Sequence, residues 1–160
     1  TYAGGIRNLN DAKKVIEKGA DRICINNLFL INSLSIKNIA FALGSQSLLV
    51  SIDIIKKEDK FFWFDYVRSK LLPLELIPLD LLDYVSEIII TDVNNEGSNN
   101  KFDTDIVNKI KTKFRTRNLI FYGGINKKNK VNSIKYHFKN SSFAIGNFFF
   151  HKELANWYFK

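Results

Sequence analysis

One carboxylate stands inside an otherwise apolar stretch of this chain. Asp53 lies in the run Leu-Leu-Val-Ser-Ile-Asp-Ile-Ile at residues 48–55, a pattern typical of a strand buried on both faces of a parallel sheet. A carboxylate there is costly unless it lies at the strand's C-terminal mouth and has a partner or a chemical task. The alternative is an Asp that ends its strand and caps the next turn. We favour the functional interpretation of Asp53.

Other charged residues mark the two ends of the predicted strands. Thr91 and Asp92 lie in the run Glu-Ile-Ile-Ile-Thr-Asp-Val at residues 87–93. Successive side chains of a strand point to opposite faces, so at most one of these two faces the interior of a closed sheet. Arg22 and Glu87 each begin a strand, and we expect a salt bridge between them at that opposite end.

A glycine doublet occurs twice. The chain reads Ala3-Gly4-Gly5-Ile6-Arg7 near its start and Tyr122-Gly123-Gly124-Ile125-Asn126 far downstream. About one βα unit after each doublet comes a small polar turn, Ile25-Asn26-Asn27 and Ile145-Gly146-Asn147. This repetition predicts an internal duplication of βα pairs. Glycines at the C-terminal ends of strands let backbone N–H groups approach an anion, and the Glu96-Gly97 turn is a further candidate.

The elements that must position these residues alternate between strand and helix. Six core strands are predicted, at 2–6, 22–26, 48–55, 87–93, 118–122 and 143–146. A further strand at 61–67 is predicted to return alongside the third of them and make a hairpin. Helical segments follow the strands, at about 11–18, 35–43, 79–85, 103–110, 127–139 and 154–159. Asn10 and either Ser33 or Ser35 are the expected N-caps of the first two helices, and Gly19 ends the first.

Strict βα alternation predicts an α/β fold with a parallel sheet. We interpret it as a (β/α)₈ barrel of TIM type, whose active sites lie at the C-terminal ends of the strands. Six units are two short of closure, so the chain is predicted to hold strands three to eight in a single domain over residues 1–160. A doubly wound, flavodoxin-like sheet is the alternative, but it does not explain the repeat.

Composition narrows the function classes. The chain carries a net charge of +8 with a pI near 9.5, which suits phosphorylated ligands, yet its lysines are spread along helix faces and no nucleic-acid motif is present. Cys24 is the single cysteine and the two histidines are isolated, so we expect no disulfide and no metal site. No membrane span is visible. We expect a cytoplasmic protein, and the absence of Met suggests a piece of a longer one.

Several segments together resemble a known family. In order and spacing they resemble the cyclase subunit of imidazole glycerol phosphate synthase, a histidine-biosynthesis (β/α)₈ barrel of about 250 residues with a twofold half-barrel repeat. The resemblance covers essentially the whole chain and is most specific through Asp53 and Asp92. The segments that carry it are 3–7, 19–26, 41–53, 87–97, 123–125 and 145–149.

The resemblance implies roles for particular residues. Asp53 matches one of two catalytic carboxylates that act as general acid and base while ammonia adds and the imidazole ring closes, and the other carboxylate belongs to strand one. Thr91 matches a threonine at the active-site mouth. Two phosphate cradles hold the ends of one bis-phosphorylated substrate. Their matching residues are Gly5, Asn26 and Asn27 for the first, and Gly97, Gly124, Gly146 and Asn147 for the second.

The resemblance also implies a partner and no cofactor. A glutaminase subunit supplies ammonia in a heterodimer, and Asp21, Arg22 and Glu87 match charged residues at the face where ammonia enters. Arg22 and Glu87 are thereby given a role beyond a salt bridge. This chain alone is expected to be inactive, because it lacks the first carboxylate and cannot close an eight-stranded barrel.

This chain departs from the family pattern at several turns. The family has Asp-Gly-Thr where this chain has Glu96-Gly97-Ser98, and a small residue where Tyr122 stands. It has Asn-Thr in place of Asn26-Asn27, Gly-Ser or Ala-Ser in place of Gly146-Asn147, and a Thr-Gly pair where Lys70-Leu71-Leu72 stands. A bulky Tyr122 would narrow the second phosphate site.

These departures leave two further hypotheses open. One is a paralogue that partners an amidotransferase in the amidation of surface-polysaccharide sugars. The other is a non-catalytic partial barrel that only binds a partner or a phosphorylated ligand. We favour the ammonia-dependent cyclase of histidine biosynthesis over both.

Overall fold

The computed structural model describes residues 1–98, 101–125 and 127–145. The chain divides into two compact units, Thr1–Ile89 and Ile90–Lys160. Strand β6 (Glu87–Asp92) runs from the first unit into the second. The helix expected at 154–159 lies outside the described residues, and the single partial-barrel domain over 1–160 stays a prediction.

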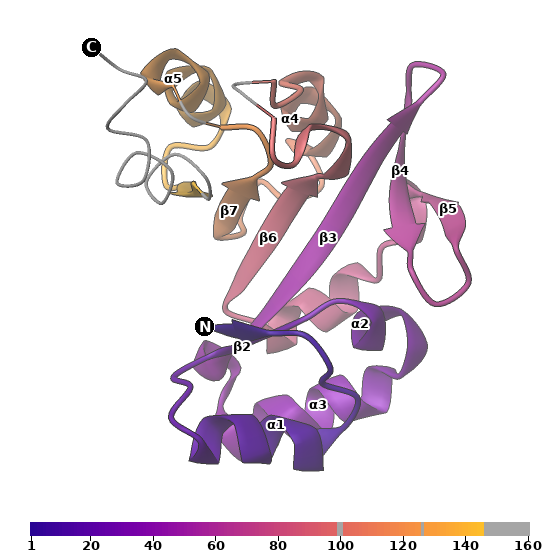
Figure 1. Cartoon of the computed structure of the whole chain (residues 1–160), viewed down its shortest axis with the longest axis vertical. Helices are drawn as coiled ribbons and strands as arrows, with labels where there is room; N and C mark the ends of the chain where they lie inside the picture. The colour runs from indigo at the N-terminus through magenta and orange to yellow at the C-terminus, as the bar shows by residue number, and fades with distance from the viewer. Residues whose placement is uncertain (99–100, 126, 146–160) are drawn as a thin grey trace, which may run out of the picture. The chain divides into compact units, whose positions relative to one another are not determined.

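The first unit is a parallel sheet with helices between its strands (Figure 1). Its strands follow the order β1-β2-β3 and then the start of β6, and Ile25 of β2 pairs in parallel with Val50 of β3. Helices α1 and α3 contact each other. The elements are β1 (Tyr2–Ala3), α1 (Leu9–Glu17), β2 (Ile23–Ile25), α2 (Asn27–Ile31), α3 (Ser33–Leu43) and β3 (Leu48–Lys57), with short 3₁₀ helices at Ser45–Ser47, Leu74–Leu76 and Leu79–Tyr84.

The second unit repeats this plan. Its strands follow the order β6-β7-β8, and β7 pairs in parallel with β8. The elements are the end of β6, a 3₁₀ turn at Val93–Asn95, α4 (Asp105–Ile110), β7 (Leu119–Tyr122), α5 (Lys128–His137) and β8 (Ser142–Ala144). Parallel strands in chain order with helices between them are the α/β arrangement of part of a (β/α)₈ barrel, as the sequence predicted.

The first helix begins two residues earlier than predicted. The side chain of Asn8, not Asn10, accepts the backbone N–H of Asp11 at 3.0 Å, and Asp11 accepts the N–H of Arg7 at 3.0 Å. These two bonds satisfy donors that the helix itself leaves free. Gly19 ends the helix as predicted, with φ 97° and its N–H donated to the carbonyl of Ile16.

A short helix that the sequence did not reveal precedes the next one. Helix α2 (Asn27–Ile31) buries Leu28 and Phe29. Asn32 then caps α3 by accepting the N–H of Ser35 at 3.0 Å, so neither Ser33 nor Ser35 is the cap. Asn32 is the cap because it stands directly before the first residue of α3, and from there its amide oxygen reaches the third N–H of the helix.

The predicted hairpin is present and has one more strand than expected. β3 pairs antiparallel with β4 (Lys60–Asp65) through a two-residue turn, in which Glu58 and Asp59 both have positive φ. β4 then pairs with β5 (Lys70–Pro73), which ends at a proline and was not predicted. β3 therefore belongs to the parallel sheet at its start and to the hairpin at its end.

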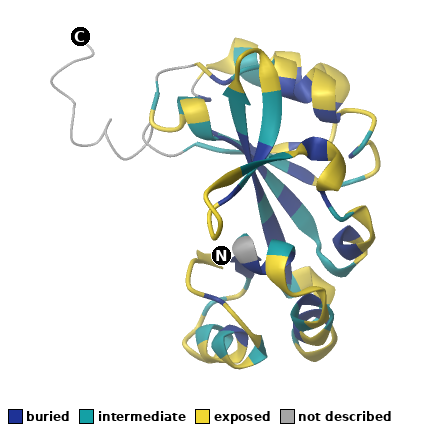
Figure 2. Ribbon diagram, turned by 90° about the vertical axis from the view of Figure 1, so that its right-hand side faces the viewer, coloured by how far each residue is buried: buried dark blue, intermediate teal, exposed yellow. Residues whose placement is uncertain are grey.

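Burial follows the predicted strand pattern. Figure 2 shows the sheet strands dark blue or teal and most loops yellow, and Leu48, Val50 and Ile52 of β3 are fully buried. In the second unit the ring of Phe121 lies 5.9 Å from that of Phe102, which packs β7 against the loop between β6 and α4. Burial of such apolar area is the main force holding each unit together.

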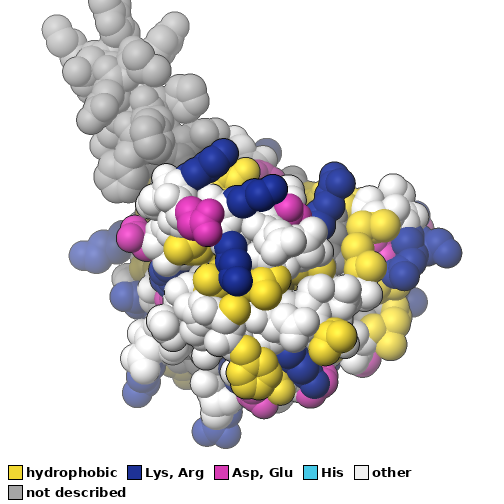
Figure 3. Space-filling model, turned by 90° about the horizontal axis from the view of Figure 1, so that it is seen from below, with side chains coloured by type: hydrophobic (Ala, Val, Ile, Leu, Met, Phe, Trp, Pro, Cys, Tyr) yellow, Lys and Arg dark blue, Asp and Glu magenta, His cyan; other side chains and the backbone are white. Residues whose placement is uncertain are grey.

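Charge is dispersed on the surface seen from below. Figure 3 shows Lys and Arg side chains standing singly on that face, with Asp and Glu between them. This agrees with the sequence interpretation that the excess basic residues do not form one stripe. Among the described residues, none of the helices is both long and apolar enough to cross a membrane.

A buried carboxylate fixes the turn between β4 and β5. Asp65 is fully buried and accepts the backbone N–H groups of Val67 at 2.9 Å and Arg68 at 3.1 Å, and the Arg68 guanidinium at 3.0 Å. Burial alone would raise the pKa of Asp65, but these donors outweigh it and hold the pKa below its ordinary value. The folded chain therefore favours the ionised form of Asp65.

We expect Asp65→Ala to lower the free energy of unfolding by about 1–3 kcal/mol near neutral pH, because three donors lose their acceptor. A carboxyl whose pKa is lowered by folding contributes stability above its unfolded pKa of about 3.9 and loses it as the pH falls through the folded value. Urea unfolding of wild type and variant at neutral and strongly acidic pH measures this. A difference that does not shrink in acid would contradict the role of the charge.

Candidate active site

Asp53 lies where β3 changes partners. Residues 48–50 of β3 pair with β2, and residues 54–57 pair with β4. Between these stretches the Asp53 carboxylate accepts the Nδ2 of Asn26 at 2.7 Å and the Oγ of Ser51 at 2.6 Å. Each carboxylate oxygen thus has one neutral donor, and Asp53 is only 8% exposed. This satisfies a carboxylate that would be costly to bury alone.

A cavity opens beside these donors. It has a volume of about 660 Å³ and lies at the ends of β1 and β2 and beside the middle of β3, and Val67 from the β4–β5 turn also lines it. Gly5, Asn26 and Ser51 are among its lining residues. The structure therefore brings the predicted phosphate residues Gly5 and Asn26 together with the predicted catalytic Asp53. Asn27 begins α2 next to this site.

The thiol of Cys24 also lines the cavity but is not activated. Burial, followed by the nearby charge of Asp53, raises the pKa of Cys24 to about 12. The thiolate is the nucleophilic form of cysteine, so this residue is inert at neutral pH. Cys24 contributes packing rather than chemistry.

The two glycine doublets have the same backbone conformation. Gly4 and Gly5 have φ values of 110° and 68°, and Gly123 and Gly124 have 104° and 71°. Residues with side chains rarely adopt these values, so glycine is required at both doublets. The agreement supports the predicted duplication at the level of the backbone.

Their surroundings differ. A Cβ on Gly4 or Gly5 would have no atom within 4 Å, whereas one on Gly123 would lie 2.5 Å from the carbonyl oxygen of Asp92. A Cβ on Gly124 would lie 2.7 Å from the Oγ of Ser98. The first turn therefore faces open space and the second packs closely against the loop after β6.

Asp92 is part of that second loop. Its carboxylate accepts the backbone N–H of Asp103 at 2.7 Å and the amide of Asn95 at 2.8 Å. Burial raises the pKa of Asp92 even though these donors oppose the shift. Thr91 is also buried, so both residues of the predicted pair lie inside the protein. Gly146 and Asn147, predicted for the second phosphate cradle, lie outside the described residues.

A tyrosine bridges the glycine turns of the second unit. The hydroxyl of Tyr122 donates to Oε1 of Glu96 at 3.0 Å. Burial, and then Glu96 itself, raise the pKa of the Tyr122 phenol above its ordinary value. The predicted cradle residues Gly97 and Gly124 lie close to this bridge, one residue after Glu96 and two after Tyr122.

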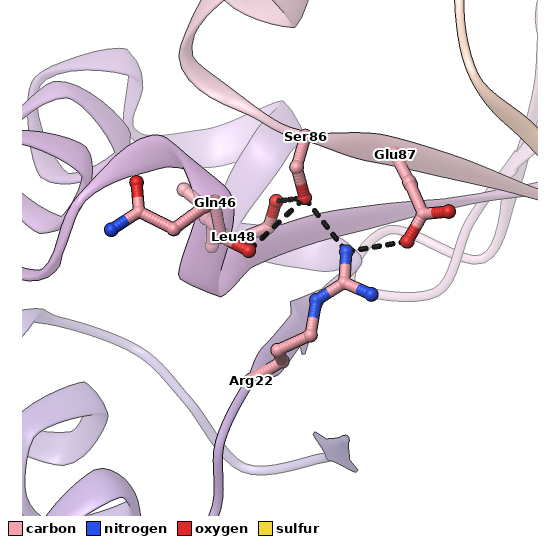
Figure 4. Close-up of polar contacts among 5 residues, drawn as sticks. All are labelled: Arg22, Gln46, Leu48, Ser86 and Glu87. Carbon is pink, nitrogen blue, oxygen red and sulfur yellow. Dashed lines mark hydrogen bonds and ion pairs between the residues drawn. The ribbon is translucent and has the colours of Figure 1, made fainter.

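The predicted salt bridge at the strand starts is confirmed (Figure 4). The guanidinium of Arg22 pairs with the carboxylate of Glu87 and donates to the Oγ of Ser86 at 2.8 Å. Ser86 in turn donates to the carbonyl of Leu48 at 3.0 Å. The group links the starts of β2, β3 and β6, whereas Asp53 lies further along β3. Asp21, predicted for the same face, is exposed.

Sequence reasoning missed two hydroxyls that complete these groups. Ser51 stands two residues before Asp53 on one strand, so strand alternation places both side chains on the same face. Ser86 stands directly before Glu87. The spacing of Ser51 and Asp53 could have been read from the sequence, but the contact of Ser86 with Arg22 depends on strand order.

Residues 1–155 match the sequence family described as "Histidine biosynthesis protein". The chain belongs to this family. Among its relatives, subunit HisF of imidazole glycerol phosphate synthase from Clostridium botulinum (strain Okra / Type B1) is 30% identical over 115 residues, which are 69% of this chain and 46% of that protein. The Streptococcus mutans subunit HisF is 32% identical over 118 residues, 69% of this chain and 45% of that protein.

A third relative matches a larger share of the chain. The Campylobacter jejuni protein named imidazole glycerol phosphate synthase subunit hisF2 is 35% identical over 132 residues, covering 79% of this chain and 51% of that protein. The chain therefore spans about half the length of the curated relatives it matches.

Within the described residues, no group of three or more His, Cys, Asp or Glu could hold a metal ion.

The matched glycines offer a direct test of the two turns. We expect Gly4→Ala to lower the local free energy of unfolding by about 1–3 kcal/mol, through positive-φ strain alone. Gly123→Ala has the same strain and also collides with the Asp92 carbonyl oxygen at 2.5 Å, which adds about 1–3 kcal/mol. Hydrogen exchange of the core amides in each unit measures both values. Equal losses would show that the second turn is not crowded.

Proposed function

We propose that this chain is part of an ammonia-dependent cyclase/lyase that forms imidazole glycerol phosphate from a bis-phosphorylated ribonucleotide in histidine biosynthesis. The observation that carries the proposal is the Asp53 carboxylate, held by Asn26 and Ser51 beside a cavity that the Gly5 turn lines. Membership of the histidine-biosynthesis family supports the reaction class.

The geometry suits proton transfer by Asp53. Both of its donors, Asn26 and Ser51, are neutral, so they fix the carboxylate's orientation without neutralising its charge. Each carboxylate oxygen has two lone pairs and uses one of them here, which leaves acceptor capacity for a substrate proton. In the proposed reaction Asp53 takes or gives a proton as ammonia adds and the ring closes. Thr91, which belongs to the second unit, is the other residue to which we assign a part in the reaction.

Phosphate binding is assigned to the glycine turns. The open space at Gly4 and Gly5 leaves their backbone accessible to an anion. In the second unit the Ser98 hydroxyl is buried and lacks a partner among the described residues, and it lies beside Gly124. A phosphate oxygen at that turn would supply the missing acceptor. Asn26, Asn27, Gly97, Gly146 and Asn147 complete the proposed set.

Asp53→Asn in the full-length protein tests the catalytic assignment. We expect turnover of the bis-phosphorylated ribonucleotide with ammonium salt to fall at least about a hundredfold, the contribution of a general acid or base, with little change in KM. Thermal unfolding controls for folding, because Asn keeps the size and the acceptor oxygen of the side chain. Unchanged kcat would remove Asp53 from the mechanism.

The partner is proposed to be a glutaminase subunit that delivers ammonia at the face of Asp21, Arg22 and Glu87. We expect Glu87→Gln, which removes the charge facing Arg22, to lower turnover driven by glutamine and the partner more than turnover driven by ammonium salt. Parallel assays with the two nitrogen sources measure the ratio. Equal losses from both sources would indicate a purely structural salt bridge.

A second candidate function is the sugar-amidation paralogue. The contact between Tyr122 and Glu96 favours it, because both residues depart from the family pattern at the proposed phosphate cradle. Assays of the full-length protein with ammonia and either the bis-phosphorylated ribonucleotide or a nucleotide-linked sugar separate the two functions. Turnover of neither substrate would favour the non-catalytic binding hypothesis.

A further inference from the structure

The two departures from the family pattern touch each other. Tyr122 stands directly before Gly123, and Glu96 stands directly before Gly97. Their side chains form the 3.0 Å hydrogen bond between the turn after β6 and the turn after β7. The repeat within the chain shows which residue is unusual, because Ala3 occupies the equivalent place before the first doublet. Only the second doublet has a side chain that can bridge.

The bridge is not needed to hold the two turns together. The backbone N–H of Phe102 donates to the carbonyl of Gly124 at 3.3 Å, and Gly123 packs against the Asp92 carbonyl without room for a Cβ. Asp92 also accepts the Asp103 N–H from the same loop. The contacts of Gly123 and Gly124 join the turns without either side chain of the pair, so the bridge can serve another role.

The negative charge of Glu96 indicates what the hydrogen bond from Tyr122 does. Glu96 is exposed and its carboxylate adjoins the Gly97 turn, so it repels an anion bound there. A phenol that donates to the carboxylate occupies one acceptor position and reduces this repulsion. The raised pKa of Tyr122 keeps the phenol protonated, and therefore a donor, well above neutral pH.

We propose that Tyr122 and Glu96 act as one specificity-determining pair for the anion site of the second unit, in which the phenol offsets the carboxylate so that a phosphate group can bind. The proposal deepens the proposed function, because it rests on phosphate binding at Gly97 and Gly124. It assigns the pair to ligand recognition, not to proton transfer. Without the hydrogen bond from Tyr122, the charge of Glu96 disfavours phosphate binding. If a neutral Gln replaces Glu96, phosphate binding no longer depends on the Tyr122 phenol.

A double-mutant cycle with inorganic phosphate tests the pair. The full-length protein is titrated as wild type, Tyr122→Phe, Glu96→Gln and the double variant, and backbone amide shifts of both glycine turns are followed by NMR. We expect Tyr122→Phe to weaken phosphate binding at Gly97 and Gly124 about three- to tenfold, comparable to the net contribution of one ordinary hydrogen bond. The same change in the Glu96→Gln background should have little effect.

The first doublet serves as the matched control within each spectrum. Phosphate shifts at Gly4 and Gly5 should be the same in all four proteins, and the remaining amide shifts report folding. Phosphate binding at the second turn that is equal in wild type and Tyr122→Phe would overturn the pair. Equal weakening in both backgrounds would also overturn it, since the phenol would then act without Glu96. Wild type with no phosphate shifts at either doublet would overturn the proposed function as well.

Discussion

The change of partner within β3 is the constraint on which the first unit depends. The strand begins in the parallel sheet beside β2 and ends in the antiparallel hairpin with β4. Asp53 lies at the switch, where the backbone leaves one neighbour before meeting the next. The side chains of Asn26 and Ser51 donate to the carboxylate at this point of the strand. Because β3 is long, a single strand carries Asp53, joins the sheet that borders the cavity and forms one side of the hairpin.

Duplication and divergence are both visible in the glycine turns. The backbone of the two doublets is nearly the same, because positive φ at both residues admits only glycine without strain. The side chains around them have changed. One turn has open space around it, and the other has Asp92, Ser98 and the Tyr122–Glu96 bridge. Backbone geometry thus persists where the surrounding chemistry has been replaced.

Much of the fold could be predicted from the sequence because its signals are local. The apolar runs of β3 and β6, the helix end at Gly19 and the repeated doublets need no knowledge of distant contacts. Helix α2 and strand β5 were missed, because each has five residues or fewer and is stabilised by tertiary packing, such as that of Phe29 against Trp63. The cap of α1 was misplaced by two residues, because Asn8 and Asn10 are both plausible caps and only geometry distinguishes them.

The candidate site was predictable in its residues but not in its partnerships. Asp53, Asn26 and Gly5 could be named from the family resemblance, yet nothing in the sequence showed that Asn26 donates to Asp53. The same limit applies to Arg22 and Ser86, which are separated by more than sixty positions in the chain. Contacts between side chains on different strands depend on strand order and register, which the sequence does not state.

A comparison of two buried aspartates, Asp53 and Asp92, shows why Asp53 is the stronger candidate for chemistry. Asp92 accepts a backbone N–H, so its position is fixed by the main chain of the loop that it closes. Replacing that bond would require the loop to open. Among the described residues, Asp53 accepts only from the side chains of Asn26 and Ser51, which also line a cavity. Side-chain donors can rotate when a substrate presents a competing donor or proton. Burial alone therefore does not distinguish a structural carboxylate from a reactive one, whereas the kind of donor does.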